Sequence, residues 1–145
     1  MPYGNLKEGW RQTGGLVNYR IWFDDKEKIT RVKIKGRFGS EDNKDFLHRL
    51  EDTFVGKQHR VAVIDVTEGK FTMPRRENRE KMVRRLHELD FERIAFVGAS
   101  PLVKMMMKII AMSLGIKGSV GSFNSDDEAL LWIQSQKKLN NIERR

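Results

Sequence analysis

Residues 94–101 have the sequence Ile-Ala-Phe-Val-Gly-Ala-Ser-Pro, which joins a strand pattern to the start of a helix. The continuous apolar run Ile94–Val97 is typical of a strand that is buried on both faces of a sheet. Gly98 ends the run, and Ser100 followed by Pro101 is a common N-cap and first-turn pair of a helix. A buried strand that leads directly into a helix predicts an α/β architecture.

The same strand-then-helix order is found on the N-terminal side of this segment. Val61–Val66 is another continuous apolar run, and Pro74 is expected in the first turn of the helix that follows. Further upstream, the β-rich segments 19–23 and 29–35 flank a charged turn, which predicts an antiparallel hairpin. Ser40 is expected to cap the first helix, because acidic residues follow it.

The C-terminal side adds one strand and one helix. Residues 120–123 predict a short strand, and Ser125 with Glu128 forms an S-x-x-E capping box for a final helix. We therefore expect an α/β fold with a mostly parallel, mixed five-stranded sheet, an N-terminal antiparallel hairpin and four helices. The expected divisions are an N-terminal extension 1–15, one domain 16–136 and a C-terminal tail 137–145.

Composition excludes several classes of protein. The chain has 145 residues and no cysteine, so disulfides, thiolate nucleophiles and cysteine-ligated metals are excluded. It lacks an apolar run of the ~20 residues that a membrane span needs. A cytoplasmic location is the expectation from these features. The net charge of +8 is concentrated in residues 93–125, which carry +4 and contain no acid.

No group of residues predicts catalysis, a cofactor or a metal ion. The three histidines, His48, His59 and His87, have no second ligand at a metal-like spacing. The chain lacks the glycine-rich phosphate-binding motifs. Ser100 follows a strand as a hydrolase nucleophile would, but Leu102 replaces the second glycine of that motif. We therefore expect that the protein is not an enzyme.

The order of several short motifs resembles the STAS superfamily, in particular its SpoIIAA-like, STAS/SEC14-type branch. The motifs are Gly36-Arg-Phe-Gly-Ser-Glu-Asp42, Val61–Val66, Ile94–Gly98, Ser100-Pro-Leu-Val-Lys104 and Phe123-Asn-Ser-Asp-Asp-Glu-Ala-Leu-Leu-Trp-Ile133. The resemblance covers residues 16–136. It implies a STAS-like domain without enzymatic activity, which works by binding a protein partner or an apolar ligand.

One loop departs from the pattern of the anti-sigma-factor antagonists in this superfamily. There, an Asp-Ser-Ser-Gly segment at a helix N-terminus contains the serine that is phosphorylated as a switch. The corresponding stretch here has Pro74 and Arg75 in place of the serine pair. Thr67 and Thr72 are the candidate regulatory hydroxyls nearby, although threonines in loops are mostly turn formers.

Residues 102–114, Leu-Val-Lys-Met-Met-Met-Lys-Ile-Ile-Ala-Met-Ser-Leu, predict a helix with an unusually wide apolar surface. Lys104, Lys108 and Ala111 share one face, and the remaining apolar arc spans about 220°, whereas packing on a core requires roughly 100°. Met105, Ile109 and Met112 form the surplus edge. Either neighbouring segments of this chain cover that edge in a wider core, or it is an interaction surface.

If the edge is functional, the candidate interface or ligand face consists of Lys104, Met105, Lys108, Ile109 and Met112. It would contact a protein partner, most simply a second copy in a homodimer, because methionine-rich surfaces adapt to varied partners. The alternative is an apolar small molecule or an anionic membrane surface, with the two lysines near lipid headgroups. Weak nucleic-acid binding through the basic helix 75–85 is a second alternative, which the sequence disfavours because acids alternate with the cations and no aromatic residue accompanies them.

Overall fold

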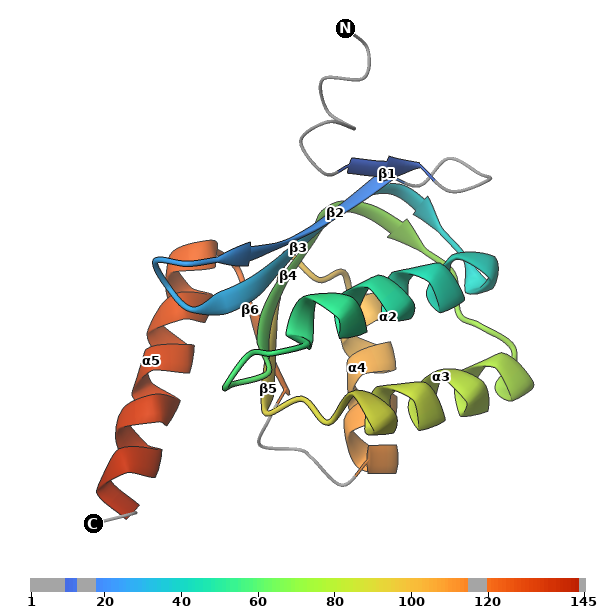
Figure 1. The fold of residues 1–145 in the computed structure, drawn as a ribbon. Helices are drawn as coiled ribbons and strands as arrows, with labels where there is room; N and C mark the ends of the chain where they lie inside the picture. Colours follow the sequence, from blue (N-terminus) through green and yellow to red (C-terminus); the bar gives the residue numbers. More distant parts are fainter. Residues whose placement is uncertain (1–9, 13–17, 115–119, 144–145) are drawn as a thin grey trace, which may run out of the picture.

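The computed structural model of the chain describes residues 10–12, 18–114 and 120–143 (Figure 1). Their six strands form one sheet in the order β1-β2-β3-β4-β5-β6. β1 and β2 pair antiparallel, as do β2 and β3, and the remaining pairs are parallel. The strands are β1 (Trp10–Gln12), β2 (Asn18–Asp24), β3 (Ile29–Phe38), β4 (Val61–Phe71), β5 (Arg93–Val97) and β6 (Val120–Phe123).

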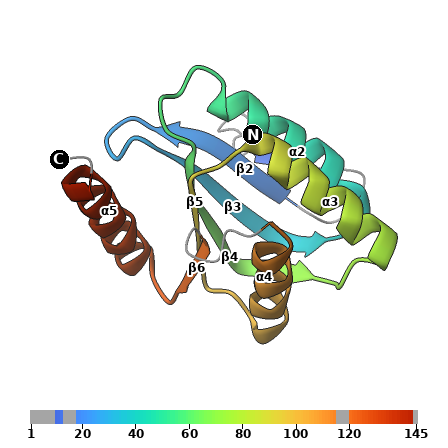
Figure 2. The same ribbon diagram turned by 90° about the horizontal axis from the view of Figure 1, so that it is seen from below.

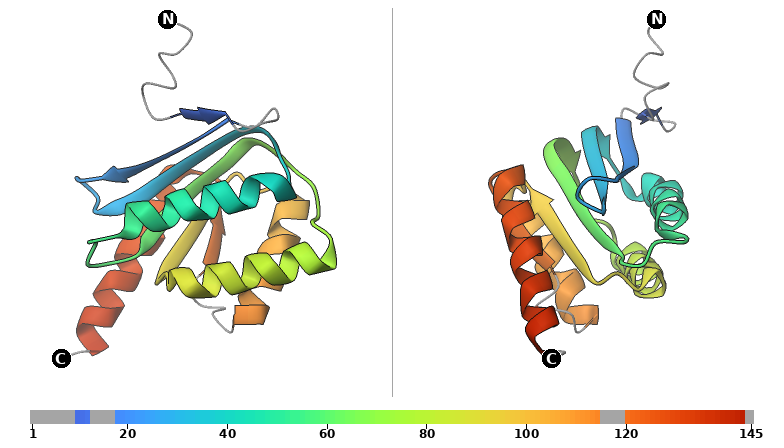
Figure 3. Two further views of the ribbon diagram at one scale, coloured as in Figure 1. Left: turned by 45° about the vertical axis from the view of Figure 1, so that its right-hand side comes forward. Right: turned by 60° about the vertical axis from the view of Figure 1, so that its left-hand side comes forward.

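Four helices of the described chain cover the two faces of the sheet unequally. They are α2 (Ser40–Phe54), α3 (Arg76–Leu89), α4 (Pro101–Leu114) and α5 (Asp126–Glu143). Figures 2 and 3 show α2, α3 and α4 on one face and α5 alone on the other. Each face has its own buried cluster: the larger one includes Val32, Leu50 and Ile64, and the smaller one includes Val63 and Ile133. The predicted mixed α/β fold is confirmed, and β1 is a sixth strand beyond the five predicted.

The hairpin of β2 and β3 forms where the charged turn predicted it. The Asp24 carboxylate accepts hydrogen bonds from the backbone N–H groups of Lys26 and Glu27, at 3.0 and 3.1 Å. Arg31 donates to the same carboxylate at 2.7 Å and to Asp126 at 2.6 Å. Arg31 therefore joins the hairpin to the first turn of α5.

β4 continues five residues beyond the predicted end at Val66, through the loop that the sequence pattern indicated. Its extension pairs with the second half of β3, after a register shift between Lys33 and Lys35. Gly69 makes room for the Phe71 ring, because a Cβ atom there would lie only 2.6 Å from that ring. The two strands thus end together at the paired residues Phe38 and Phe71.

α3 begins later than predicted. Pro74 precedes the helix instead of lying in its first turn, and Arg75 in extended backbone is the N-cap. Leu89 is the buried residue of α3, whereas Met82, Val83 and Leu86 are half-buried. The N-terminal turns of α3 therefore stand away from the densely packed part of the molecule.

The predicted caps of α4 and α5 are present. The Ser100 hydroxyl accepts a hydrogen bond from the Val103 N–H at 3.3 Å. The Ser125 hydroxyl accepts one from the Glu128 N–H at 3.2 Å, and the Glu128 carboxylate accepts one from the Asn124 N–H at 3.2 Å. α5 continues to Glu143, into the segment expected to be a tail, and β1 lies in the expected extension. The domain limits themselves remain a prediction.

Candidate functional site

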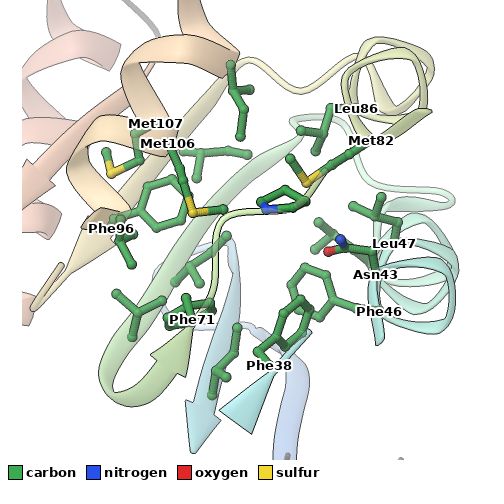
Figure 4. A pocket seen from close by; sticks show the side chains of 18 of the residues that line it. Phe38, Asn43, Phe46, Leu47, Phe71, Met82, Leu86, Phe96, Met106 and Met107 are labelled. Atoms are coloured by element: carbon green, nitrogen blue, oxygen red, sulfur yellow. The ribbon is translucent and has the colours of Figure 1, made fainter. Parts of the chain in front are cut away.

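An apolar pocket of about 130 Å³ lies between the sheet and helices α2, α3 and α4 (Figure 4). Strands β3 to β6 form the floor of the pocket, and the three helices form its sides. No charged side chain is among the lining residues. They are Ile34, Phe38, Gly39, Asn43, Phe46, Leu47, Leu50, Ile64, Val66, Phe71, Thr72, Pro74, Met82, Leu86, Phe91, Ile94, Phe96, Val103, Met106, Met107, Ile110 and Val120.

The polar residues of the lining gather at one end of the pocket. Phe38 and Phe71 are paired across β3 and β4, so Gly39 and Thr72, which follow them, lie at the same edge of the sheet. Asn43 lies one helical turn beyond Gly39, and its side-chain amide points into the pocket (Figure 4). We call this group of Gly39, Asn43 and Thr72 the polar end.

Methionines contribute to the pocket wall from two helices. Met82 of α3 and Met106 of α4 approach it from facing helices, and Met107 lies one residue further along α4 (Figure 4). Thioether side chains are flexible and polarizable, so they adapt to ligands of different shape. The pocket is therefore polar at the strand ends and soft and apolar between α3 and α4.

Aromatic rings hold the strand-end part of the pocket in shape. Phe38 packs edge-on against Phe46 at 5.5 Å between ring centroids, and it packs against Phe71 at 5.6 Å. Phe46 also packs edge-on against Tyr19, whose hydroxyl donates a hydrogen bond to Asp45. These contacts connect the rings to β2 through Tyr19 and to α2 through Phe46, so this wall is preorganised.

One ion pair ties α3 to α2 beside the pocket. The Arg85 guanidinium donates two hydrogen bonds to the Glu51 carboxylate, at 2.9 and 3.1 Å. Through those bonds, Arg85 holds the pKa of Glu51 below its ordinary value. The paired, bidentate geometry fixes both distance and orientation between the two helices.

The interface residues predicted on α4 lie together on its outer face. Met105 is 48% exposed, Ile109 36% and Met112 66%, and Lys104 and Lys108 beside them are also exposed. We call these five residues the α4 edge. Ala111, which the sequence pattern placed with the lysines, is instead buried with Val103 and Met107. The helix thus divides its apolar arc between the pocket and the outer surface, and a binding role for the edge remains a prediction.

The two candidate hydroxyls lie in different places. Thr67 is in β4, where its hydroxyl lies against Gly98: a Cβ atom on that glycine would be 2.1 Å from the Thr67 Oγ1 atom. Thr72 follows β4 and belongs to the polar end of the pocket. The structure therefore does not bring them together, and a regulatory role for either remains a prediction.

The basic helix 75–85 has acids close to its cations. Arg76 forms an ion pair with Glu80 at 3.3 Å, and Arg85 is paired with Glu51. In the described part of the chain, no three His, Cys, Asp or Glu side chains come together as the ligands of a metal ion would. Among the same residues, no helix combines the length and apolar character that crossing a bilayer requires.

Sequence reasoning missed the pocket itself. Phe46, Leu47, Met82 and Leu86 occur at helical spacing in the sequence, and such spacing shows which face of a helix is apolar but not how closely two faces pack. The one available signal was the wide apolar arc of residues 102–114, part of which lines the pocket through Met106 and Ile110.

Comparison with known proteins gives a consistent result. A family model described as SpoIIAA-like matches residues 29–134. A DUF3478-family protein with a SpoIIAA-like fold from Shewanella loihica PV-4 is 21% identical, with a TM-score of 0.57 over 86% of this chain and 98% of that chain. An anti-sigma-factor antagonist (STAS) domain protein from Planctomyces limnophilus is 17% identical, with a TM-score of 0.53 over 78% and 95%. No curated protein matches this chain.

Proposed function

Because this chain belongs to the SpoIIAA-like family and has the STAS fold, we propose that it is a binding module, not an enzyme, and that it holds a small apolar molecule in the pocket. The observation that supports this most directly is a charge-free space of about 130 Å³ inside a domain of only 145 residues. Cavities of roughly this size, when lined by aliphatic and aromatic side chains, stay dry and bind benzene-sized molecules. A cytoplasmic location remains a prediction from the sequence.

A pocket of this size is unusual in the core of a small domain. Protein interiors are close-packed, with few voids larger than a water molecule. The pocket of about 130 Å³ departs from this close packing and has an apolar lining, so an occupant explains the space better than loose packing does.

The test is whether an apolar probe stabilises the protein by entering this space. Toluene at near-saturating concentration should raise the Tm of the full chain, because a ligand that binds only the folded state stabilises it. Leu86→Trp would fill the pocket from α3 and should abolish the rise. The matched control is Leu131→Trp on α5, the helix on the opposite face of the sheet from the pocket. The Leu131 side chain is 63% exposed. An unchanged Tm of the wild-type protein with toluene would refute the proposal.

A second function, protein docking, is favoured by the exposure of the α4 edge. Its two methionines are 48% and 66% exposed, and methionines are frequent at adaptable binding surfaces. Lys104 and Lys108 lie beside them, and residues 93–125 contain no acid. Charge complementarity therefore favours a partner protein that presents apolar side chains flanked by acids. A second copy is less suited, because a twofold contact through this edge brings like charges together.

The oligomeric state and a vesicle assay separate the occupants of the α4 edge. We expect the purified chain to be monomeric by size-exclusion chromatography with light scattering, and not to float with vesicles containing anionic lipid. A dimer that Met105→Asp dissociates would show that the α4 edge binds a second copy of the chain and not an acidic partner protein. Flotation that the same substitution abolishes would show that the α4 edge binds a membrane surface.

A further inference from the structure

Building on the proposed function, we infer that the pocket selects a neutral, ring-sized molecule with a single hydrogen-bonding group, which lies at the polar end beside Asn43. Phenols, aromatic alcohols and small ring ketones belong to this chemical class. The inference depends on the size of the pocket, on the absence of charge in its wall, and on the placement of its few polar residues.

Size excludes long-chain ligands in this conformation. A volume of about 130 Å³ accommodates one six-membered ring with a small substituent. The walls come from three helices and four strands, so a longer chain would extend out of the pocket or require these elements to separate. The molecule that fits without such movement is ring-sized.

The lining excludes a charged ligand. No Lys, Arg, His, Asp or Glu is among the residues that line the pocket. A carboxylate or ammonium group would lose its hydration there without gaining a counter-charge. Arg79 lies in a small neighbouring crevice next to Met73, where its guanidinium donates to the Pro74 carbonyl at 3.2 Å. The occupant is therefore neutral.

The polar end adds one directional requirement. The Asn43 amide points into the pocket and offers both a donor and an acceptor, so it can pair with a hydroxyl, a carbonyl or a ring N–H (Figure 4). Thr72 is the other polar residue of the lining. The rest of the lining has no polar side chain, so a second polar group on the ligand would be buried without a partner.

The remaining walls suit a flat ring. Phe38, Phe46 and Phe71 lie at the polar end, and Phe96 faces them from β5 (Figure 4). Aromatic pairs prefer edge-to-face or offset contacts, and thioether sulfur packs favourably against ring edges. An aromatic ring between these phenylalanines and the sulfur atoms of Met82 and Met106 satisfies both preferences.

Three probes with the same seven-carbon skeleton test each part of this inference: toluene, benzyl alcohol and benzoate. Their Kd values are measured by NMR titration of the full-length protein and of two variants, Asn43→Leu and Lys44→Leu. Lys44 is exposed on the same turn of α2, so its replacement is the matched control. We expect benzyl alcohol and toluene to bind the wild-type protein and benzoate to bind at least tenfold more weakly than benzyl alcohol.

The ratio of the two neutral Kd values isolates the hydrogen bond, because the hydration of each free probe is the same for every variant. Asn43→Leu should weaken benzyl alcohol relative to toluene by roughly tenfold, and Lys44→Leu should leave the ratio unchanged. Toluene binding with an unchanged ratio in Asn43→Leu overturns the role of the polar end and leaves the proposed function intact. Benzoate binding as tight as benzyl alcohol overturns neutrality. Failure of all three probes overturns the proposed function itself.

Discussion

At the scale of single residues, Gly98 shows why a loop position that looks unremarkable is closely constrained. Its φ of +74° lies in the left-handed region, which side chains other than glycine seldom adopt. The Thr67 side chain also occupies the space where a Cβ atom would be. Gly98 therefore lets β5 turn toward the start of α4 while β4 passes close beside it.

Replacement of Gly98 should reveal two separate costs. We expect Gly98→Ala to lower the free energy of unfolding by more than ~2 kcal/mol, because it adds backbone strain to a clash with Thr67. Gly56→Ala is the matched control: Gly56 has a φ of +77° with nothing within 4 Å of its Cβ position, so it should lose only the strain of about 1 kcal/mol. Urea denaturation measures both. Equal losses would show that the Thr67 contact relaxes freely.

The Glu51–Arg85 ion pair makes a prediction about acid stability. The pKa of Glu51 is lowered in the folded protein, so the stability from its ionised form is fully present above the ordinary value of 4.5 and disappears as the pH falls through the lowered value. The stability difference between wild-type protein and Glu51→Gln should therefore shrink as the pH falls below about 4.5 in urea titrations.

Glu80→Gln serves as the control for this pH dependence. Glu80 has a single 3.3 Å contact with Arg76 on its own helix, and both side chains are well exposed. Its replacement should alter the acid limb less than Glu51→Gln does, because isolated surface pairs contribute little. A parallel loss in both variants would mean that general charge, and not the bond between α2 and α3, causes the effect.

At the scale of elements, α4 has two apolar faces with different surroundings. Val103, Met107 and Ala111 face the interior, Met106 and Ile110 also line the pocket, and Met105 and Met112 are exposed. A helix that only closed a core would not need both faces to be apolar. α4 therefore contributes both to the pocket and to the candidate docking surface.

Two charge substitutions on α4 should therefore differ strongly in their effect on the free energy of unfolding. Met105→Asp should change the free energy of unfolding by no more than about 0.5 kcal/mol, because its side chain is half exposed. Met107→Asp should cost more than ~3 kcal/mol, because it would bury an unpaired carboxylate. Thermal or urea denaturation measures both. A large loss in Met105→Asp would assign the α4 edge to the core and remove the argument for docking.

At the scale of the whole molecule, the two faces of the sheet are closed differently. α5 packs directly on β4, β5 and β6 through Ala129 and Ile133, which are almost fully buried. On the other face, α3 buries only Leu89 and lies beside the pocket. Stability is therefore expected to be lowest where the pocket separates helix from sheet.

Hydrogen exchange should display this asymmetry directly. Amides in the first two turns of α3 should exchange faster than those of β4 and β5, because the half-buried Met82, Val83 and Leu86 provide little packing. Toluene should slow exchange in α3 more than in the first two turns of α5, since α3 lines the pocket and α5 does not. Uniform protection of both helices, with or without toluene, would contradict this account.

The sequence by itself determined the order of strands and helices from β2 to α5. Apolar runs such as Val61–Val66, the turn at Asp24 and the caps at Ser100 and Ser125 act locally, so each can be recognised without knowledge of the rest of the chain. The SpoIIAA-like resemblance followed from the order of those local signals. The five residues of the α4 edge were also found this way, because the width of an apolar arc is a property of one helix.

Only the tertiary structure decided where apolar surfaces meet and where they stay apart. The extension of β4 to Phe71 depends on its pairing with β3, and the pocket depends on the distance between α3 and the sheet. Asn43 gains its role from side chains contributed by six other elements. Hydrophobic periodicity shows that a face will be buried, but the free space between buried faces is set by how whole elements pack, which no local pattern encodes.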